Sequence, residues 1–129
     1  MRMMLKVSIP AEAGNKGVKE GILPKTVMGF VEQMKPEACY FGPEGGKRTA
    51  FFFFDLTDPT MIPTAAEPFF TNLNAAIEMT PVMNLDEMKA CSPTSSLTDG
   101  YAAAEDKLEN YRRQLKLPEQ AAGVLVAVK

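Results

Sequence analysis

The chain has 129 residues, with 14 lysine and arginine residues against 16 aspartate and glutamate residues, which gives a net charge of -2. This length suits one domain with a core plus an appendage, and the near-neutral charge leaves no broad cationic surface for a phosphate backbone, so we expect no nucleic-acid partner. The absence of histidine excludes Ser-His-Asp and Cys-His catalysis and removes imidazole as a metal ligand.

The first predicted element is a strand over residues 2 to 9, whose apolar side chains alternate with a more mixed set. The apolar members are Met3, Leu5, Val7 and Ile9. Pro10 ends this run, which is too short for the hydrophobic core of a signal peptide or for a membrane span. We therefore expect a cytoplasmic protein that has no membrane partner.

A helical segment is predicted next, over residues 15 to 34, because apolar residues recur there at roughly helical spacing. Gly21 and Pro24 interrupt the pattern. We expect a short helical piece, a kink near Pro24, and a firmer helix that ends at about Met34, before Pro36.

A β-hairpin is the strongest local signal in the chain. Two aromatic-rich stretches, EACYFG and KRTAFFFFDL, flank the turn sequence PEGG, and proline and glycine between strand-forming runs are typical of hairpin turns. The turn superficially resembles a phosphate-binding loop. That motif needs glycine at position 41 and serine or threonine at position 48, where the chain has Phe41 and Arg48. We therefore interpret the segment as a turn.

An irregular helix is predicted between the hairpin and the last strand of the sheet. Asp58 is a suitable N-cap and Pro59 fits the first helical position. Pro63 and Pro68 disfavour a straight helix, because proline lacks the amide hydrogen that an interior position needs.

A strand over residues 75 to 83 and a short helix capped by Asn84 complete the N-terminal part. The predicted order is β-α-β-β-α-β, which is an α+β, ferredoxin-like arrangement with a four-stranded antiparallel sheet. We assign residues 1 to 90 to this domain.

Residues 91 to 129 are expected to form a linker, an amphipathic helix and an apolar tail. Residues 91 to 100 have a linker composition. An apolar stripe predicts a helix over residues 100 to 117, and it fits packing on its own domain and contact with another subunit equally well. The stripe consists of Tyr101, Ala104, Leu108, Tyr111 and Leu115. The run over residues 121 to 129 fits either an extra strand or a poorly ordered tail.

Four consecutive phenylalanines, Phe51, Phe52, Phe53 and Phe54, stand in the second arm of the hairpin. Side chains alternate in a strand, so one pair faces each side of the sheet. Each ring has about 150 to 250 Å² of surface, and an exposed pair would match the largest apolar patch of a usual monomer. Helices are expected to cover one pair. For the other pair we favour the sheet of a second copy over the C-terminal helix folding back.

The stretches KTVMGFVEQMKPEACYF and AEPFFTNLNAAIEMTPVMN, together with the hairpin, resemble the dimeric α/β-barrel superfamily of ferredoxin-like domains, and in particular small uncharacterised bacterial proteins. The resemblance covers residues 1 to 90 and implies a homodimer in which two four-stranded sheets face each other. The superfamily includes cofactor-independent monooxygenases, haem-degrading enzymes, isomerases and members without known activity. The fold alone therefore does not select a function.

The chain also resembles sequences that are labelled pantothenate synthetase. Enzymes of that family resemble nucleotidyl transferases, with paired histidines on a Rossmann-like scaffold. This chain has no histidine and too few residues for such a scaffold, so we do not expect that activity.

Lys6 and Glu78 are the main candidates for acid/base chemistry. They belong to strands that are neighbours in a ferredoxin-like sheet, and burial in a shared cavity would shift their pKa values. A structural ion pair near a strand end is the plainer interpretation. Tyr40 and Arg48 come from the two arms of the hairpin and could supply a phenol and an anion-binding group to a site. The alternative is that both side chains belong to a solvated hairpin arm.

Two functions follow from these observations. The first is a small homodimer that binds an apolar or weakly acidic small molecule between sheet and helices. The second is a cofactor-independent monooxygenase or isomerase that acts on a hydrophobic substrate through Lys6, Glu78 and Tyr40. Cys39 and Cys91 lack the spacing of a redox or zinc motif and are expected to be free thiols. We expect no cofactor and no metal site.

Overall fold

The computed structural model describes residues 1 to 91 and 95 to 116, and the chain divides into two compact units, Met1–Val82 and Met83–Lys129. The first unit contains, in order, β1 (Arg2–Ile9), α1 (Ala11–Lys19), α2 (Ile22–Met34), β2 (Ala38–Glu44), β3 (Lys47–Asp55), a 3₁₀ turn (Pro59–Met61), α3 (Ile62–Leu73) and β4 (Ala76–Pro81). The second unit contains α4 (Leu85–Ala90) and α5 (Ser95–Leu115). The division after Val82 lies earlier than the boundary expected at residue 90.

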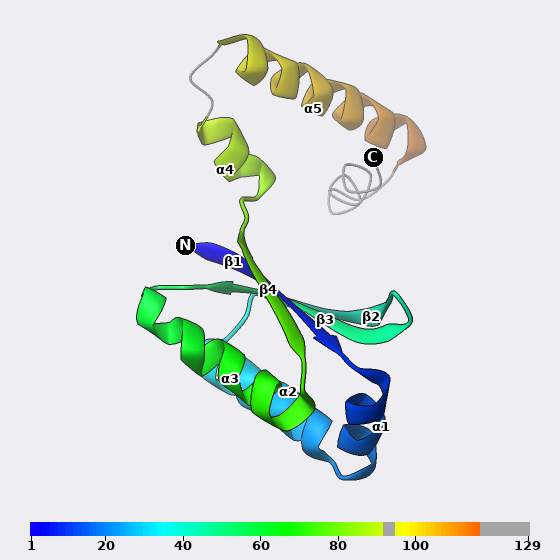
Figure 1. Cartoon of the computed structure of the whole chain (residues 1–129). Helices are drawn as coiled ribbons and strands as arrows, with labels where there is room; N and C mark the ends of the chain where they lie inside the picture. The colour runs from blue at the N-terminus through cyan, green and yellow to red at the C-terminus, as the bar shows by residue number, and fades with distance from the viewer. Residues whose placement is uncertain (92–94, 117–129) are drawn as a thin grey trace. The chain divides into compact units, whose positions relative to one another are not determined.

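The first unit is a ferredoxin-like α+β fold. Its four strands are all paired antiparallel in the order β2-β3-β1-β4, and α1, α2 and α3 cover one face of the sheet (Figure 1). The register places Leu5 opposite Phe52 on one side and Met79 on the other. The predicted fold class and sheet are therefore confirmed.

The first helical segment differs from the prediction at its start and at its break. It begins at Ala11, directly after Pro10, and the break falls at Gly21. Gly21 has a φ of 75°, a conformation that glycine adopts without the clash of a Cβ atom. Pro24 does not kink the helix, because it lies in the first turn of α2, where its missing amide hydrogen has no intrahelical partner to lose.

The predicted hairpin turn and the two predicted helix caps are confirmed. Gly45 and Gly46 form the hairpin turn with positive φ values of 59° and 75°, as a two-residue type I′ turn requires. Asp58 caps its helical segment by accepting a hydrogen bond of 2.8 Å from the Thr60 amide. Asn84 forms a capping box at the start of α4. The fourth strand is shorter than predicted and ends at Pro81.

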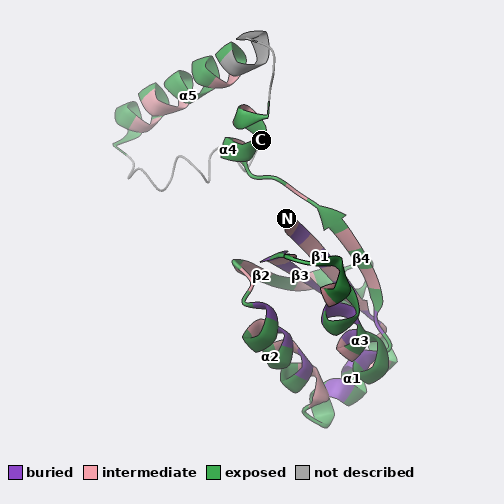
Figure 2. Ribbon diagram, turned by 90° about the vertical axis from the view of Figure 1, so that its left-hand side faces the viewer, coloured by how far each residue is buried: buried purple, intermediate pink, exposed green. Residues whose placement is uncertain are grey.

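The core lies between the sheet and the three helices. Phe52 and Phe54 are fully buried there, and the Phe30 ring of α2 packs against Phe52 with 4.5 Å between ring centroids. Figure 2 shows the buried residues of the helices on the side that faces the sheet. Phe51 and Phe53 point to the face of the sheet opposite α1, α2 and α3, which we call the open face, and they are half-buried. Helices therefore cover one phenylalanine pair, as expected, and the covering of the other pair stays a prediction.

In the second unit, α5 begins at Ser95, inside the stretch predicted as a linker. That part of the prediction is wrong. The Tyr101 hydroxyl donates to Met88 Sδ of α4 over 3.1 Å. Tyr111 and Leu115 of the predicted stripe are each 49% exposed. The apolar run over residues 121 to 129 lies outside the described residues. No helix in the described part of the chain is long and apolar enough to cross a membrane.

Candidate functional site

The three predicted catalytic residues lie on the open face of the sheet. The register aligns Tyr40, Phe51, Lys6 and Glu78 in one row across β2, β3, β1 and β4. Lys6 and Glu78 are therefore direct cross-strand neighbours, as predicted from the strand order. Tyr40 belongs to the same row, but Phe51 stands between it and Lys6.

Lys6 forms its ion pair with Glu44, at the end of β2. The hydrogen bond that Lys6 donates to Glu44, together with the negative charges of Glu44 and Glu78, raises its pKa above the ordinary value of 10.5, against the opposing effect of desolvation. A lysine that acts as a base at neutral pH needs a lowered pKa. The pocket that Lys6, Glu44 and Glu78 line has a volume of only about 200 Å³. Lys6 is thus a paired cation here, and a catalytic role for it stays a prediction.

Tyr40 is the third residue of this set, and its side chain is 63% exposed. Its ring lies edge-on to that of Phe53, with 6.1 Å between centroids. The aromatic pair belongs to an apolar area in the middle of the open face. The position of Tyr40 therefore fits contact with a partner protein as well as it fits a catalytic role.

A larger cavity of about 630 Å³ opens on the other face of the sheet, between the β2–β3 hairpin and the helices α1 and α2. We call it the hairpin cleft. It is lined by Ile9, Ala11, Leu23, Val27, Phe41, Gly42, Pro43, Gly46, Lys47, Arg48, Thr49 and Ala50. Most of these side chains are apolar, and Lys47 and Arg48 are the only charged ones in the part of the lining that the structure describes. The size of the cleft is typical of small-molecule sites.

The hairpin cleft exists because β3 changes from large to small residues along its helix-facing side. Phe52 and Phe54 fill the space under the helices, whereas Ala50, two residues earlier, carries only a methyl group. Phe41 pairs with Ala50 across the hairpin and is 62% exposed at the edge of the sheet. Its ring lies 5.8 Å from that of Phe52. The cleft is therefore continuous with the aromatic core.

Arg48 is held in the wall of the hairpin cleft by α1. Its Nη1 donates to Asn15 Oδ1 over 2.9 Å. A Cβ atom added at Gly14 would lie 2.9 Å from the same Nη1 and 3.3 Å from a methyl carbon of Ile9. The absence of a side chain at position 14 therefore allows the guanidinium to lie against α1. A guanidinium in this position can bind a carboxylate through charge-assisted hydrogen bonds.

The structure separates the two candidate residues that the arms of the hairpin offered, a phenol and an anion-binding group. Arg48 lies on the helix-facing side of β3, whereas Tyr40 lies on the open face. The apolar lining by Leu23, Val27 and Phe41 was not predicted as a site. The exposed Phe41 next to the small Ala50 was the available signal, but it becomes a cavity only once α2 is placed over the hairpin.

No group of acidic or cysteine side chains within the two described ranges could hold a metal ion. No family model matches this chain, and no curated protein matches it. The likeness to the dimeric α/β-barrel superfamily therefore stays a prediction from the sequence.

Proposed function

We propose that this chain is a homodimeric binding protein for a small, apolar, weakly acidic molecule. The observation that carries the proposal is the hairpin cleft, which joins an apolar wall to the cations Lys47 and Arg48 and has no carboxylate among its described lining residues. Burial of the ligand's hydrocarbon part would provide most of the affinity. The cations would favour a carboxylate or a similar anion over a neutral or positively charged head group.

The open face of the sheet supports the homodimer in this proposal. An apolar group lies there: Met4 is the cross-strand neighbour of Phe53, and Phe51 lies in the adjacent row. The Tyr40 ring contacts that of Phe53. Ion pairs between Arg2 and Glu37 and between Lys6 and Glu44 lie around this apolar centre. Arg2 is the first residue of β1, and Glu44 is the last residue of β2. An apolar centre with a charged rim is the common pattern of a protein interface, and a second copy offers a surface of the same kind.

The ligand half of the proposal is tested by isothermal titration calorimetry with octanoate, octanol and octylamine, which share one hydrocarbon chain. We expect octanoate to bind best, because it alone carries a negative charge. Octylamine binding as tightly as octanoate would overturn the assignment, since a cation should be repelled by Lys47 and Arg48.

The position of the ligand is tested with Val27→Phe, which puts a larger side chain into the hairpin cleft. The matched control is Met28→Phe, at a neighbouring position that is 61% exposed and does not line the cleft. We expect Val27→Phe to remove octanoate binding while circular dichroism shows a folded chain, and Met28→Phe to leave binding unchanged. Equal binding by both variants would place the ligand elsewhere.

A further inference from the structure

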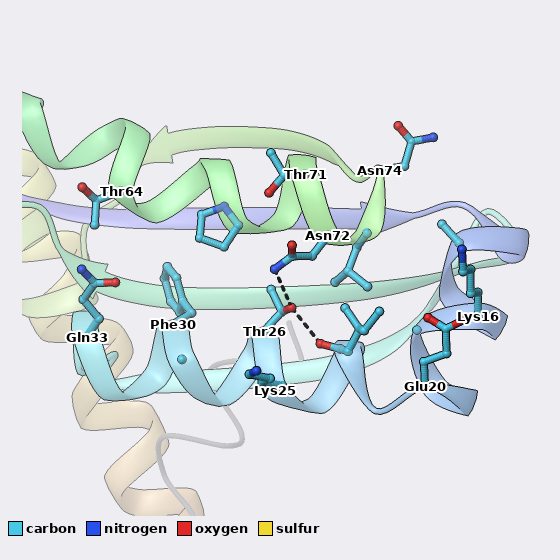
Figure 3. Close-up of a pocket in the computed structure, with 16 residues that line it drawn as sticks. Lys16, Glu20, Lys25, Thr26, Phe30, Gln33, Thr64, Thr71, Asn72 and Asn74 are labelled. Carbon is cyan, nitrogen blue, oxygen red and sulfur yellow. Dashed lines mark hydrogen bonds between the residues drawn. The ribbon is translucent and has the colours of Figure 1, made fainter.

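A second cavity, of about 700 Å³, lies among the helices α1, α2 and α3 and shares no lining residue with the hairpin cleft. We call it the helix groove. Figure 3 shows α2 and α3 as its two long walls, with α1 at one end. Its size is within the range of small-molecule sites. Its chemistry differs from that of the hairpin cleft, because half of its lining residues in the described part of the chain carry a hydroxyl, amide or ammonium group.

Hydrogen-bonding side chains face each other across the helix groove. Thr26 of α2 is buried, donates to the Ile22 carbonyl over 2.7 Å and accepts from Asn72 Nδ2 of α3 over 3.2 Å (Figure 3). This bond fixes the Asn72 amide and leaves its carbonyl oxygen as an acceptor. Gln33 and Thr64 lie at the end of the groove away from α1 (Figure 3). Such groups both donate and accept, as the hydroxyl groups of a polyol do.

Two lysines line the helix groove: Lys16 lies at its α1 end, and Lys25 lies between that end and Gln33 (Figure 3). Lys16 comes from α1 and Lys25 from the first turns of α2. Neither forms an ion pair with another residue of the described part of the chain. Among the described residues, Glu20 is the single carboxylate in the lining, so the two lysines give this part of the groove a net positive charge. A phosphate monoester carries about 1.5 to 2 negative charges at neutral pH, and lysine binds it as a point charge.

Gly29 leaves the middle of the helix groove open. A Cβ atom added there would meet nothing within 4 Å, so packing does not require glycine, although glycine is unfavourable inside a helix. Lys25, Gly29 and Gln33 follow each other at intervals of four residues and therefore lie on one face of α2. The distance from Lys25 to Gln33 along the helix axis is about 12 Å, enough for a phosphate followed by a sugar.

We propose that the helix groove binds a phosphorylated polyol, with its phosphate in the part of the groove that Lys16 and Lys25 line and its hydroxyl groups along the amide and hydroxyl side chains of α2 and α3. A sugar phosphate and a nucleotide both have this chemistry. The site is distinct from the hairpin cleft, so neither proposal depends on the other.

Calorimetry of the full chain with four probes tests the chemistry. Ribose-5-phosphate and AMP share the phosphorylated ribose, adenosine lacks the phosphate, and inorganic phosphate lacks the polyol. We expect ribose-5-phosphate and AMP to bind more tightly than adenosine and inorganic phosphate. Tighter binding of AMP than of ribose-5-phosphate would identify a nucleotide, and equal binding a sugar phosphate. The proposal is overturned if neither phosphorylated ribose binds at millimolar concentration, or if inorganic phosphate or adenosine binds equally well.

Two pairs of variants test the place. Gly29→Leu fills the helix groove and should abolish binding, whereas Gly29→Ala leaves most of the space and should retain it. Lys25→Gln should weaken binding about three- to tenfold, whereas Lys19→Gln, which removes the same charge from α1 outside the groove, should change it less than twofold. Unchanged binding by folded Gly29→Leu, or an equal effect of the two lysine variants, would show that the ligand does not occupy this groove.

Discussion

Phe52 and Phe53 are adjacent in β3, yet they face opposite sides of the sheet. Phe52 has no exposed surface and packs against Phe30 of α2, with 4.5 Å between ring centroids. Phe53 is half-buried on the open face, where its ring lies edge-on to that of Tyr40. Because the two rings have different surroundings, their substitution should produce different results: loss of stability at position 52 and loss of self-association at position 53.

Phe52→Ala should lower the free energy of unfolding by about 3 to 5 kcal/mol, the usual range for removing a buried aromatic ring and leaving a cavity. Phe52→Asp should prevent folding, because a carboxylate would be placed among aromatic rings without a partner. Urea denaturation measures the first variant and circular dichroism the second. A loss of less than 1 kcal/mol for Phe52→Ala would mean that the core does not depend on this ring.

Phe53→Glu should leave the fold intact and convert the proposed dimer into a monomer. Both copies of the variant would bring an unpaired carboxylate into the interface, which should weaken association on the order of 100-fold or more. Phe70→Glu is the matched control, because Phe70 is a 43% exposed phenylalanine of α3 rather than of the sheet. Size-exclusion chromatography with light scattering measures the mass. A monomeric parent chain would contradict the dimer directly.

Local signals were sufficient for most of the fold. The hairpin was predictable because Gly45 and Gly46 supply the positive φ values of its turn, and the caps by Asp58 and Asn84 depend on residues no more than three positions away. The start of α5 was missed because threonine and serine resemble a linker in composition. A helix can nevertheless include such residues when the segment that follows them is strongly helical.

The sites were less predictable, because they depend on which side of the sheet a residue faces and on what covers it. Strand order and alternation place Lys6, Tyr40 and Glu78 on one face of the sheet, and the register then aligns them in one row. The hairpin cleft needs the position of α2 over Ala50, and the helix groove needs α1, α2 and α3 together. A sequence pattern gives neither, since it contains no information on the spacing between helices.

Arg48→Gln should remove the preference of the hairpin cleft for an acid. We expect the affinity for octanoate to fall about five- to tenfold and that for octanol to stay the same, because the lost interaction is a charge-assisted hydrogen bond at a partly solvated site. Arg48→Lys keeps the charge and should retain much of the affinity. A parallel loss for octanoate and octanol in Arg48→Gln would indicate a change in the shape of the cleft instead.

Asp58 should make stability depend on pH in the acidic range. The backbone hydrogen bond from Thr60, followed by that from the Thr60 side chain, holds the pKa of Asp58 below its ordinary value of 3.8. A carboxyl group with a lowered pKa in the folded state stabilises the fold above its unfolded pKa, and this contribution is lost as the pH falls through the folded pKa. Asp58→Asn can still cap the helix but does not titrate. The stability difference between the two chains, measured by urea denaturation, should therefore shrink below about pH 4; a difference that stays constant down to about pH 2 would contradict this account.

Gly17 and Gly29 should respond in opposite directions to the same substitution. Gly29 lies inside α2 with open space around its Cβ position, so Gly29→Ala should stabilise the chain by about 0.5 to 1 kcal/mol. Gly17 lies in α1, where a Cβ atom would be 2.9 Å from a methyl carbon of Leu73 and 3.3 Å from Cβ of Leu23. Leu73 is fully buried and cannot move without disturbing the core. Gly17→Ala should therefore lower the free energy of unfolding by about 1 to 3 kcal/mol. Thermal and urea unfolding of the two variants measure the contrast, and a gain in stability for Gly17→Ala would show that α1 is not packed this closely on α3.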